Sequence, residues 1–134
     1  MIECPETLVC DVTPAAELNV PLDATAPSIA RAFLRRTYCD AHHARVLDEA
    51  ELLVSELITN GVEHGAPPIA LRVTCDGTSG LRVAVRDGSP RAPQARDAGP
   101  EDDSGRGIAL VDMLSTSWGV ETSEQGKTTW FTLA

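Results

Sequence analysis

A run of apolar residues that repeats every 3.6 positions is the feature that most restricts how this chain can fold. The repeat predicts an amphipathic helix over 48–65, with one side packed against a core. Gly65 and the prolines after it predict the end of this helix, because glycine and then proline commonly follow a helix C-terminus. The apolar positions are Leu47, Ala50, Leu53, Val54, Leu57, Ile58 and Val62.

Two polar residues of this helix, Glu56 and Asn60, are four positions apart. Residues at that spacing point the same way on a helix. A carboxylate and an amide oxygen side by side can serve a metal ion and a proton-transfer step together. The plainer alternative is that both belong to the solvated face of an amphipathic helix. Gly61, which costs about 1 kcal/mol relative to alanine inside a helix, indicates a place where another group can come close to the backbone.

After this helix the apolar repeat changes from 3.6 to 2, which predicts β-structure. Apolar and polar residues alternate over 69–75 and again over 81–86, and the segment 76–80 between them is rich in turn residues. This pattern predicts an antiparallel hairpin with one buried face. A second hairpin is predicted from 118–122 and 128–133.

The remaining elements are two helices and an edge strand. One helix is predicted over 27–38, a second over 108–115, and a short strand over 7–12 within a lead-in of residues 1–20. The resulting order is helix, helix, strand, strand, loop, helix, strand, strand. It predicts an α+β fold in which a helical layer covers one face of a largely antiparallel sheet.

Composition restricts the class of protein further. A length of 134 residues suits a single domain over 1–134. The net charge of −9 argues against a nucleic-acid partner, because such proteins usually present a basic patch. The four cysteines show no zinc-binding spacing, and no signal peptide or membrane-spanning run is visible. We therefore expect a cytoplasmic protein that contacts neither nucleic acid nor membrane.

A long irregular segment, 88–106, separates the first hairpin from the last helix. Connections of this length inside a compact domain are usually lids, binding loops or linkers. The segment ends in Gly105-Arg106-Gly107. A glycine pair before a helix indicates phosphate binding, because the N–H groups at a helix start have no partners within the helix.

Four motifs in this order resemble those of the ATP-binding domain of the GHKL superfamily, which gyrase-type topoisomerases, Hsp90 chaperones, histidine kinases and MutL share. The resemblance covers about residues 20–134 and is greatest to stand-alone bacterial anti-sigma factors that are serine/threonine kinases. It implies the Bergerat ATP-binding fold, a two-layer α/β sandwich with a mixed, mostly antiparallel sheet, and ATP and Mg²⁺ as cofactors. The motifs are Glu56-Leu57-Ile58-Thr59-Asn60, Asp87-Gly88, Ser104-Gly105-Arg106-Gly107 and Gly126-Lys127-Thr128-Thr129.

The resemblance also implies roles for single residues. Asn60 would supply a carbonyl oxygen to Mg²⁺ bridging the ATP phosphates. Glu56 would be the general base, or would orient the attacking hydroxyl or water. Asp87 would accept a hydrogen bond from the exocyclic amine of adenine. Thr128 would lie near the adenine, with Thr129 as the alternative one residue further on.

The glycine motifs receive roles in the same way. Gly88 follows the adenine-binding aspartate, although the family's usual D-x-G-x-G pattern is incomplete here. Gly105 and Gly107 would let the backbone approach the phosphates, and the segment 88–106 would be the ATP lid. Arg106 would touch a phosphate oxygen or face solvent.

The implied function is an ATP-dependent serine/threonine kinase and anti-sigma factor in a partner-switching system. Such a kinase sequesters a sigma factor and phosphorylates an anti-anti-sigma protein of the STAS type, and it is expected to be a homodimer. The alternative is an ATP-binding interaction module that sequesters a protein partner without phosphorylating it. A third reading is a metal-free scaffold with a vestigial pocket.

Overall fold

The sheet of this protein has five strands in the order β1-β2-β3-β5-β4, and each neighbouring pair is antiparallel. The computed structural model describes residues 16–38, 44–75, 80–89 and 103–133, with the backbone alone over 103–107. The strands are β1 Ala16–Val20, β2 Ile69–Cys75, β3 Leu81–Asp87, β4 Ser117–Ser123 and β5 Gly126–Leu133.

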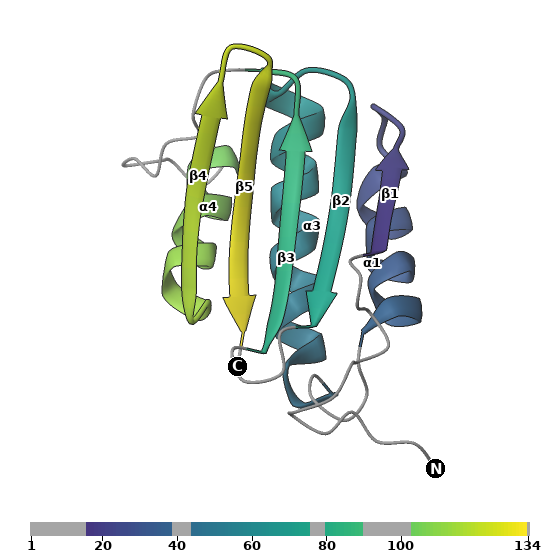
Figure 1. Ribbon diagram of the computed structural model, residues 1–134, viewed down its shortest axis with the longest axis vertical. Coiled ribbons are helices and arrows are strands. Elements are labelled where there is room, and N and C mark those ends of the chain that lie inside the picture. Colours follow the sequence, from purple (N-terminus) through teal and green to yellow (C-terminus); the bar gives the residue numbers. More distant parts are fainter. Residues whose placement is uncertain (1–15, 39–43, 76–79, 90–102, 134) are drawn as a thin grey trace.

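The helices α1 Ala26–Thr37, α3 Leu47–His64 and α4 Asp103–Leu114 lie on one face of this sheet (Figure 1). A short 3₁₀ helix, η1 Ala44–Val46, leads into α3. In Figure 1, α3 runs along the middle of the sheet between α1 and α4. The predicted α+β fold, with helices covering one face of an antiparallel sheet, is confirmed.

The core lies between α3 and the sheet. The predicted apolar stripe is buried from Leu47 to Ile58, and Val62 packs against the edge of the core. Alternate residues of β2 and β3, such as Leu71 and Val83, are buried because successive side chains of a strand point to opposite faces. The change of repeat from 3.6 to 2 therefore marks the boundary between the two layers.

The strand at the N-terminal edge differs from the prediction. The strand expected over 7–12 lies outside the residues that the structure describes, whereas β1 occupies 16–20, which the sequence analysis left without a strand. Leu18 of β1 pairs with Leu71 of β2. This strand is short, half-exposed and followed by Pro21, all features of an edge strand with a weak sequence signal.

The helix before the second hairpin is longer than expected. Residues 108–115 were predicted to be helical, but α4 begins at Asp103 and ends at Leu114. Of the helices the structure describes, none is long and apolar enough to span a bilayer.

Candidate functional site

Two strands and two helices that are far apart in the sequence have an end at the same end of the molecule. At this end, which is uppermost in Figure 1, β3 ends, β5 begins, α3 ends and α4 begins. Asp87, the last residue of β3, is directly opposite Lys127 in the pairing of β3 with β5. The fold thus brings the end of the predicted catalytic helix to the predicted adenine-binding aspartate.

Asp87 is buried, with 4% of its surface exposed. Its Oδ1 atom accepts a hydrogen bond from the backbone N–H of Ser89, at 2.7 Å. The ammonium group of Lys127 lies 3.2 Å from Oδ1 and 3.0 Å from Oδ2. Lys127 is itself only 8% exposed. The two residues therefore form a buried ion pair, which the sequence analysis did not anticipate.

The segment that follows α3 packs against Asp87. A Cβ atom built on Gly65 would lie 2.7 Å from Cγ of Asp87, so only glycine fits at this position without a shift. The N–H of Gly88 donates a hydrogen bond of 2.6 Å to the carbonyl of Ala66. Gly88 thus joins the end of β3 to the segment after α3, while its predicted contact with a nucleotide stays a prediction.

Glu56 and Asn60 lie on the side of α3 that is turned away from α1. On the α1 side, Arg31 donates a hydrogen bond of 2.8 Å to the hydroxyl of Ser55. At 3.6 residues per turn, Glu56 and Asn60 are rotated from Ser55 by about 100° and 140° around the helix axis. Since α3 lies between α1 and α4, this rotation directs the pair towards the α4 side.

The amide group of Asn60 fits a role in ligand binding. Its Nδ2 atom is buried and has no hydrogen-bond partner among the residues described. Buried polar atoms are nearly always paired, so an orphan atom indicates a group that completes the site. Because the amide oxygen and nitrogen are assigned only through their partners, the same buried end can present a carbonyl oxygen to a cation.

A cation at this position would need further oxygen ligands. Within the described parts of the chain, no cluster of three or more histidine, cysteine, aspartate or glutamate residues could hold a metal ion. Mg²⁺ is commonly bound by one or two protein oxygens together with phosphate oxygens and water. The donor set around Asn60 therefore fits a metal that arrives with a nucleotide.

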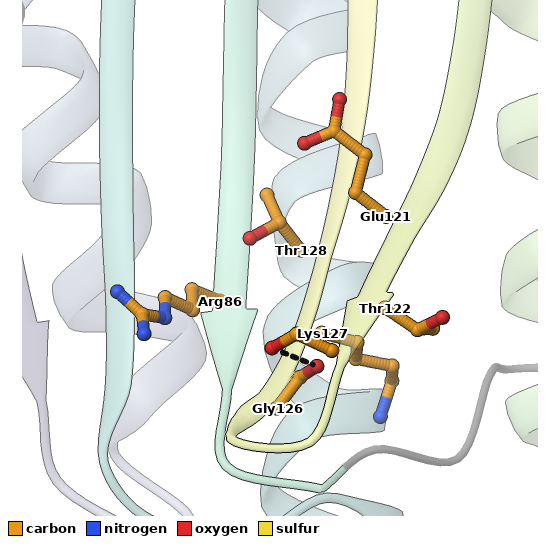
Figure 2. Close-up of a pocket in the computed structure, with 7 residues that line it drawn as sticks. Arg86, Glu121, Thr122, Gly126, Lys127 and Thr128 are labelled. Carbon is orange, nitrogen blue, oxygen red and sulfur yellow. Dashed lines mark hydrogen bonds between the residues drawn. The ribbon is translucent and has the colours of Figure 1, made fainter.

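The strand register places Thr128 on the face of the sheet opposite to Asp87. Thr128 lies between Arg86 of β3 and Glu121 of β4, on the face of the sheet that carries no helix. Figure 2 shows Thr128 and Glu121 together on that open face, while the side chain of Lys127 reaches away from Arg86. Thr128 and Asp87 are thus on opposite faces of the sheet.

The alternative residue, Thr129, is on the helix-covered face. It pairs with Val85 and is 5% exposed. Lys127 and Thr129 are therefore the residues of this motif that share a face with Asp87. The register of β3 and β5 favours Thr129 over Thr128, and it brings Lys127 against Asp87, a neighbour that the sequence did not predict. Alternation with the apolar Phe131 and Leu133 indicates that Lys127 and Thr129 share the buried face, but only the pairing with β3 places Lys127 beside Asp87.

A shallow hollow on the open face of the sheet includes Thr128 and Lys127 in its lining. Its volume is about 200 Å³, and it lies beside the turn between β4 and β5 (Figure 2). It contains neither Asn60 nor Asp87. Its lining residues are Arg86, Glu121, Thr122, Ser123, Gly126, Lys127 and Thr128.

The glycine motif lies within α4 rather than before it. Gly105 and Gly107 fall in the first two turns of a helix that begins at Asp103. The first four N–H groups of a helix have no partners within it, so this end can still bind a phosphate. The side chain of Arg106, and residues 90–102 of the predicted lid, lie outside what the structure describes; their roles stay predictions.

The sequence of this chain matches the family model described as the histidine kinase-like ATPase domain over residues 20–133. The chain belongs to this family. The match confirms the predicted resemblance to the GHKL superfamily and implies an ATP-binding domain. It covers every element of the site, from the end of β1 through α3 and Asp87 to β5.

Two relatives extend this comparison. An uncharacterized protein of Streptomyces coelicolor is 38% identical over 72 residues, which are 51% of this chain and 69% of the relative. The crystal structure of the RsbU and RsbW domains of Rv1364c from Mycobacterium tuberculosis superimposes with a TM-score of 0.66 and 20% identity. That match covers 90% of this chain and 31% of the mycobacterial chain, so this chain spans about a third of its length. The similarity to the mycobacterial structure is one of fold.

Proposed function

We propose that this protein is an ATP-binding serine/threonine kinase and anti-sigma factor that phosphorylates a STAS-type anti-anti-sigma protein. The observation that carries the proposal is that the end of the helix that bears Asn60 lies against Asp87 in a histidine kinase-like ATPase domain. A buried carboxylate, and an amide whose buried nitrogen has no partner among the described residues, would supply the acceptor and the metal ligand that a nucleotide needs. The fold similarity to a structure that contains an RsbW domain supports the anti-sigma branch of the family.

In this proposal each residue of the site has a separate part in binding. Asp87 accepts a hydrogen bond from the exocyclic amine of adenine, and Thr129 lies on the same face of the sheet. Asn60 offers its carbonyl oxygen to Mg²⁺, and the start of α4, with Gly105 and Gly107, faces the phosphates. Mg²⁺ neutralises the negative charge on the phosphates, which lowers the cost of moving charge during phosphoryl transfer.

Glu56 has the remaining chemical role. It takes the proton from the partner's serine or threonine hydroxyl as that oxygen forms a bond to the γ-phosphorus of ATP. The bond between the γ-phosphorus and the bridging oxygen breaks, and ADP leaves with that electron pair. Glu56 lies one helical turn before Asn60, so the base and the metal ligand are held by the same rigid helix.

The wider proposal concerns partners and organisation. One domain over 1–134, with residues 88–106 as the ATP lid, holds a sigma factor until the STAS protein competes for it. The proposal places the chain in the cytoplasm as a homodimer that contacts neither nucleic acid nor membrane directly. Its acidic charge of −9 supports a protein partner over nucleic acid.

A transfer assay tests the kinase. The full chain is incubated with [γ-³²P]ATP, Mg²⁺ and candidate STAS proteins, and label on the partner is measured. We expect the wild type and Glu63→Ala to label the partner, and Glu56→Ala to lose labelling while it still binds ATP. Glu63 is the matched control, because it lies on the same helix but faces solvent.

The assay also separates the kinase from its alternative. If the wild type binds Mg-ATP and labels no STAS partner, the kinase is wrong and the ATP-binding interaction module takes its place. If the wild type shows no ATP-dependent rise in melting temperature at millimolar Mg-ATP, nucleotide binding itself is contradicted.

A further inference from the structure

The ion pair between Asp87 and Lys127 places a second polar group beside the residue expected to read the adenine. The two side chains come from adjacent strands and are direct register partners. Both are nearly excluded from solvent. The ammonium group therefore lies within hydrogen-bond distance of the carboxylate that is expected to bind the adenine.

The hydrogen-bonding capacity of the pair is only partly used. Oδ1 of Asp87 receives both the N–H of Ser89 and the ammonium group of Lys127, but Oδ2 receives the ammonium group alone among the residues described. An ammonium group has three N–H donors, and the carboxylate can engage two of them. At least one donor of Lys127 and one lone pair of Oδ2 remain for a ligand.

We infer that Lys127 is a second base-recognition residue, which donates a hydrogen bond to a ring nitrogen of adenine while Asp87 accepts one from the exocyclic amine. The inference rests on the proposed binding of ATP at this end of the sheet. Adenine presents an N–H donor on its exocyclic amine beside ring-nitrogen acceptors, N1 on one side and N7 on the other. A carboxylate oxygen and an ammonium group about 3.0 Å apart match such a donor and acceptor pair.

The arrangement also opposes guanine. Guanine carries a carbonyl oxygen at the position of the adenine amine and an N–H at position 1. In the same pose, the guanine oxygen would face the carboxylate of Asp87. If Lys127 contacts position 1, the N–H of guanine would also face the ammonium group. If Lys127 contacts position 1, it adds to the discrimination that Asp87 provides; at N7, where guanine also has an acceptor, it does not.

A simpler role for Lys127 is that of a counter-ion, which only neutralises the buried carboxylate. A counter-ion would stabilise Asp87 without contacting the base, so it would be insensitive to changes in the ring nitrogens. A donor to the base would respond to the loss of one of them. Nucleotide analogues, compared in the wild type and in a variant without the ammonium group, distinguish the two roles.

The test is isothermal titration of the full chain with the magnesium complexes of ATP, 1-deaza-ATP and 7-deaza-ATP. In each analogue, a carbon replaces one ring nitrogen beside the amine. We expect one of them to bind the wild type roughly tenfold to a hundredfold more weakly than ATP, the loss of one hydrogen bond from a charged donor. The Lys127→Met variant has no donor at this position. It should therefore bind ATP and the same analogue with equal affinity.

Each outcome is decisive. Equal affinity of the wild type for ATP and both analogues overturns the inference while the proposed ATP binding stands. If Lys127→Met loses as much affinity for the analogue, relative to ATP, as the wild type does, the inference is overturned as well. The missing nitrogen would then have a different partner. If Lys127→Met does not fold, equal affinity of the wild type for ATP and both analogues still overturns the inference. Absence of binding by ATP itself overturns the proposed function and this inference with it.

Discussion

Gly65 lies so close to Asp87 that a Cβ atom on the glycine would be 2.7 Å from the carboxylate carbon and 2.8 Å from Oδ2. The last turn of α3 and the end of β3 are therefore joined at the site itself. Asn60 is five residues before this contact, so the position of the amide relative to the carboxylate depends on it. The helix and the strand cannot separate here without changing both functional groups.

Alanine at position 65 should disturb this junction. The added methyl group would overlap Asp87, so Gly65→Ala should lower the free energy of unfolding by about 1–3 kcal/mol and weaken ATP binding. Gly61→Ala is the control, because its Cβ would meet Cδ1 of Ile69 at 3.4 Å and alanine favours a helix by about 1 kcal/mol. Urea unfolding of both variants checks this; equal stability of Gly65→Ala and the wild type would contradict it.

The buried pair of Asp87 and Lys127 should contribute to stability only as a pair. Lys127→Met leaves a buried carboxylate without its counter-charge, which should cost about 3–5 kcal/mol. The double variant Asp87→Asn with Lys127→Met should recover part of that loss, because no buried charge remains. A double-mutant cycle by urea unfolding measures the coupling.

The control for this cycle is the exposed pair of Arg72 and Glu17, whose charged atoms are 3.4 Å apart. Arg72→Met should cost less than about 1 kcal/mol, since solvent screens exposed pairs. Similar losses in Lys127→Met and Arg72→Met would show that burial does not strengthen the Asp87–Lys127 pair.

Asn60→Ala should remove the response to nucleotide without weakening the unliganded protein. The Nδ2 atom of Asn60 makes no hydrogen bond to the described residues that alanine would lose. A ligand at 100 times its Kd stabilises the wild type by about 2.7 kcal/mol, so melting curves with and without Mg-ATP should separate clearly. Glu63→Ala should retain the shift, and a full shift in Asn60→Ala would count against its metal role.

Thr128 and Thr129 provide a matched pair of substitutions. Thr129→Val removes a hydroxyl from the face shared with Asp87, and loss of one hydrogen bond worth about 0.5–1.5 kcal/mol should weaken ATP binding roughly 2- to 13-fold. Thr128→Val changes the open face and should leave affinity unchanged. Titration calorimetry compares the two, and the opposite ranking would reinstate Thr128.

Asp23, which lies just before α1, should make the free energy of unfolding depend on pH. The hydroxyl and then the backbone N–H of Thr25 donate hydrogen bonds to Asp23, and they hold its pKa below the ordinary value of 3.8. Because the folded pKa is lowered, the contribution is present above the unfolded pKa and is lost as pH falls through the folded pKa. Asp23→Ala should therefore be less stable than the wild type at pH 7 and approach it in acid.

Urea unfolding of both proteins from pH 7 down to pH 2 measures this dependence, and an NMR titration follows the Asp23 carboxyl directly. A difference between the proteins that stays constant over this range would show that the charge of Asp23 plays no part.

The sequence alone determined the layers of this protein and half of its site. The stripe from Leu47 to Val62 could face only a core, and the change to a repeat of 2 after Pro68 could produce only strands. These patterns depend on local periodicity, which is readable without knowing any partner segment. The motifs around Asn60 and Asp87 were recognised through their resemblance to the GHKL superfamily, which needs only the local sequence.

The tertiary structure decided which side chains of β5 share a face with Asp87. A shift of one residue moves every side chain of a strand to the other face, and hydrogen bonds to a distant strand set that register. Pairing with β3 placed Lys127 against Asp87 and turned Thr128 to the open face. The burial of the ion pair, and the closure of Gly65 over it, depend on contacts between segments far apart in the chain. Local sequence carries no record of such contacts.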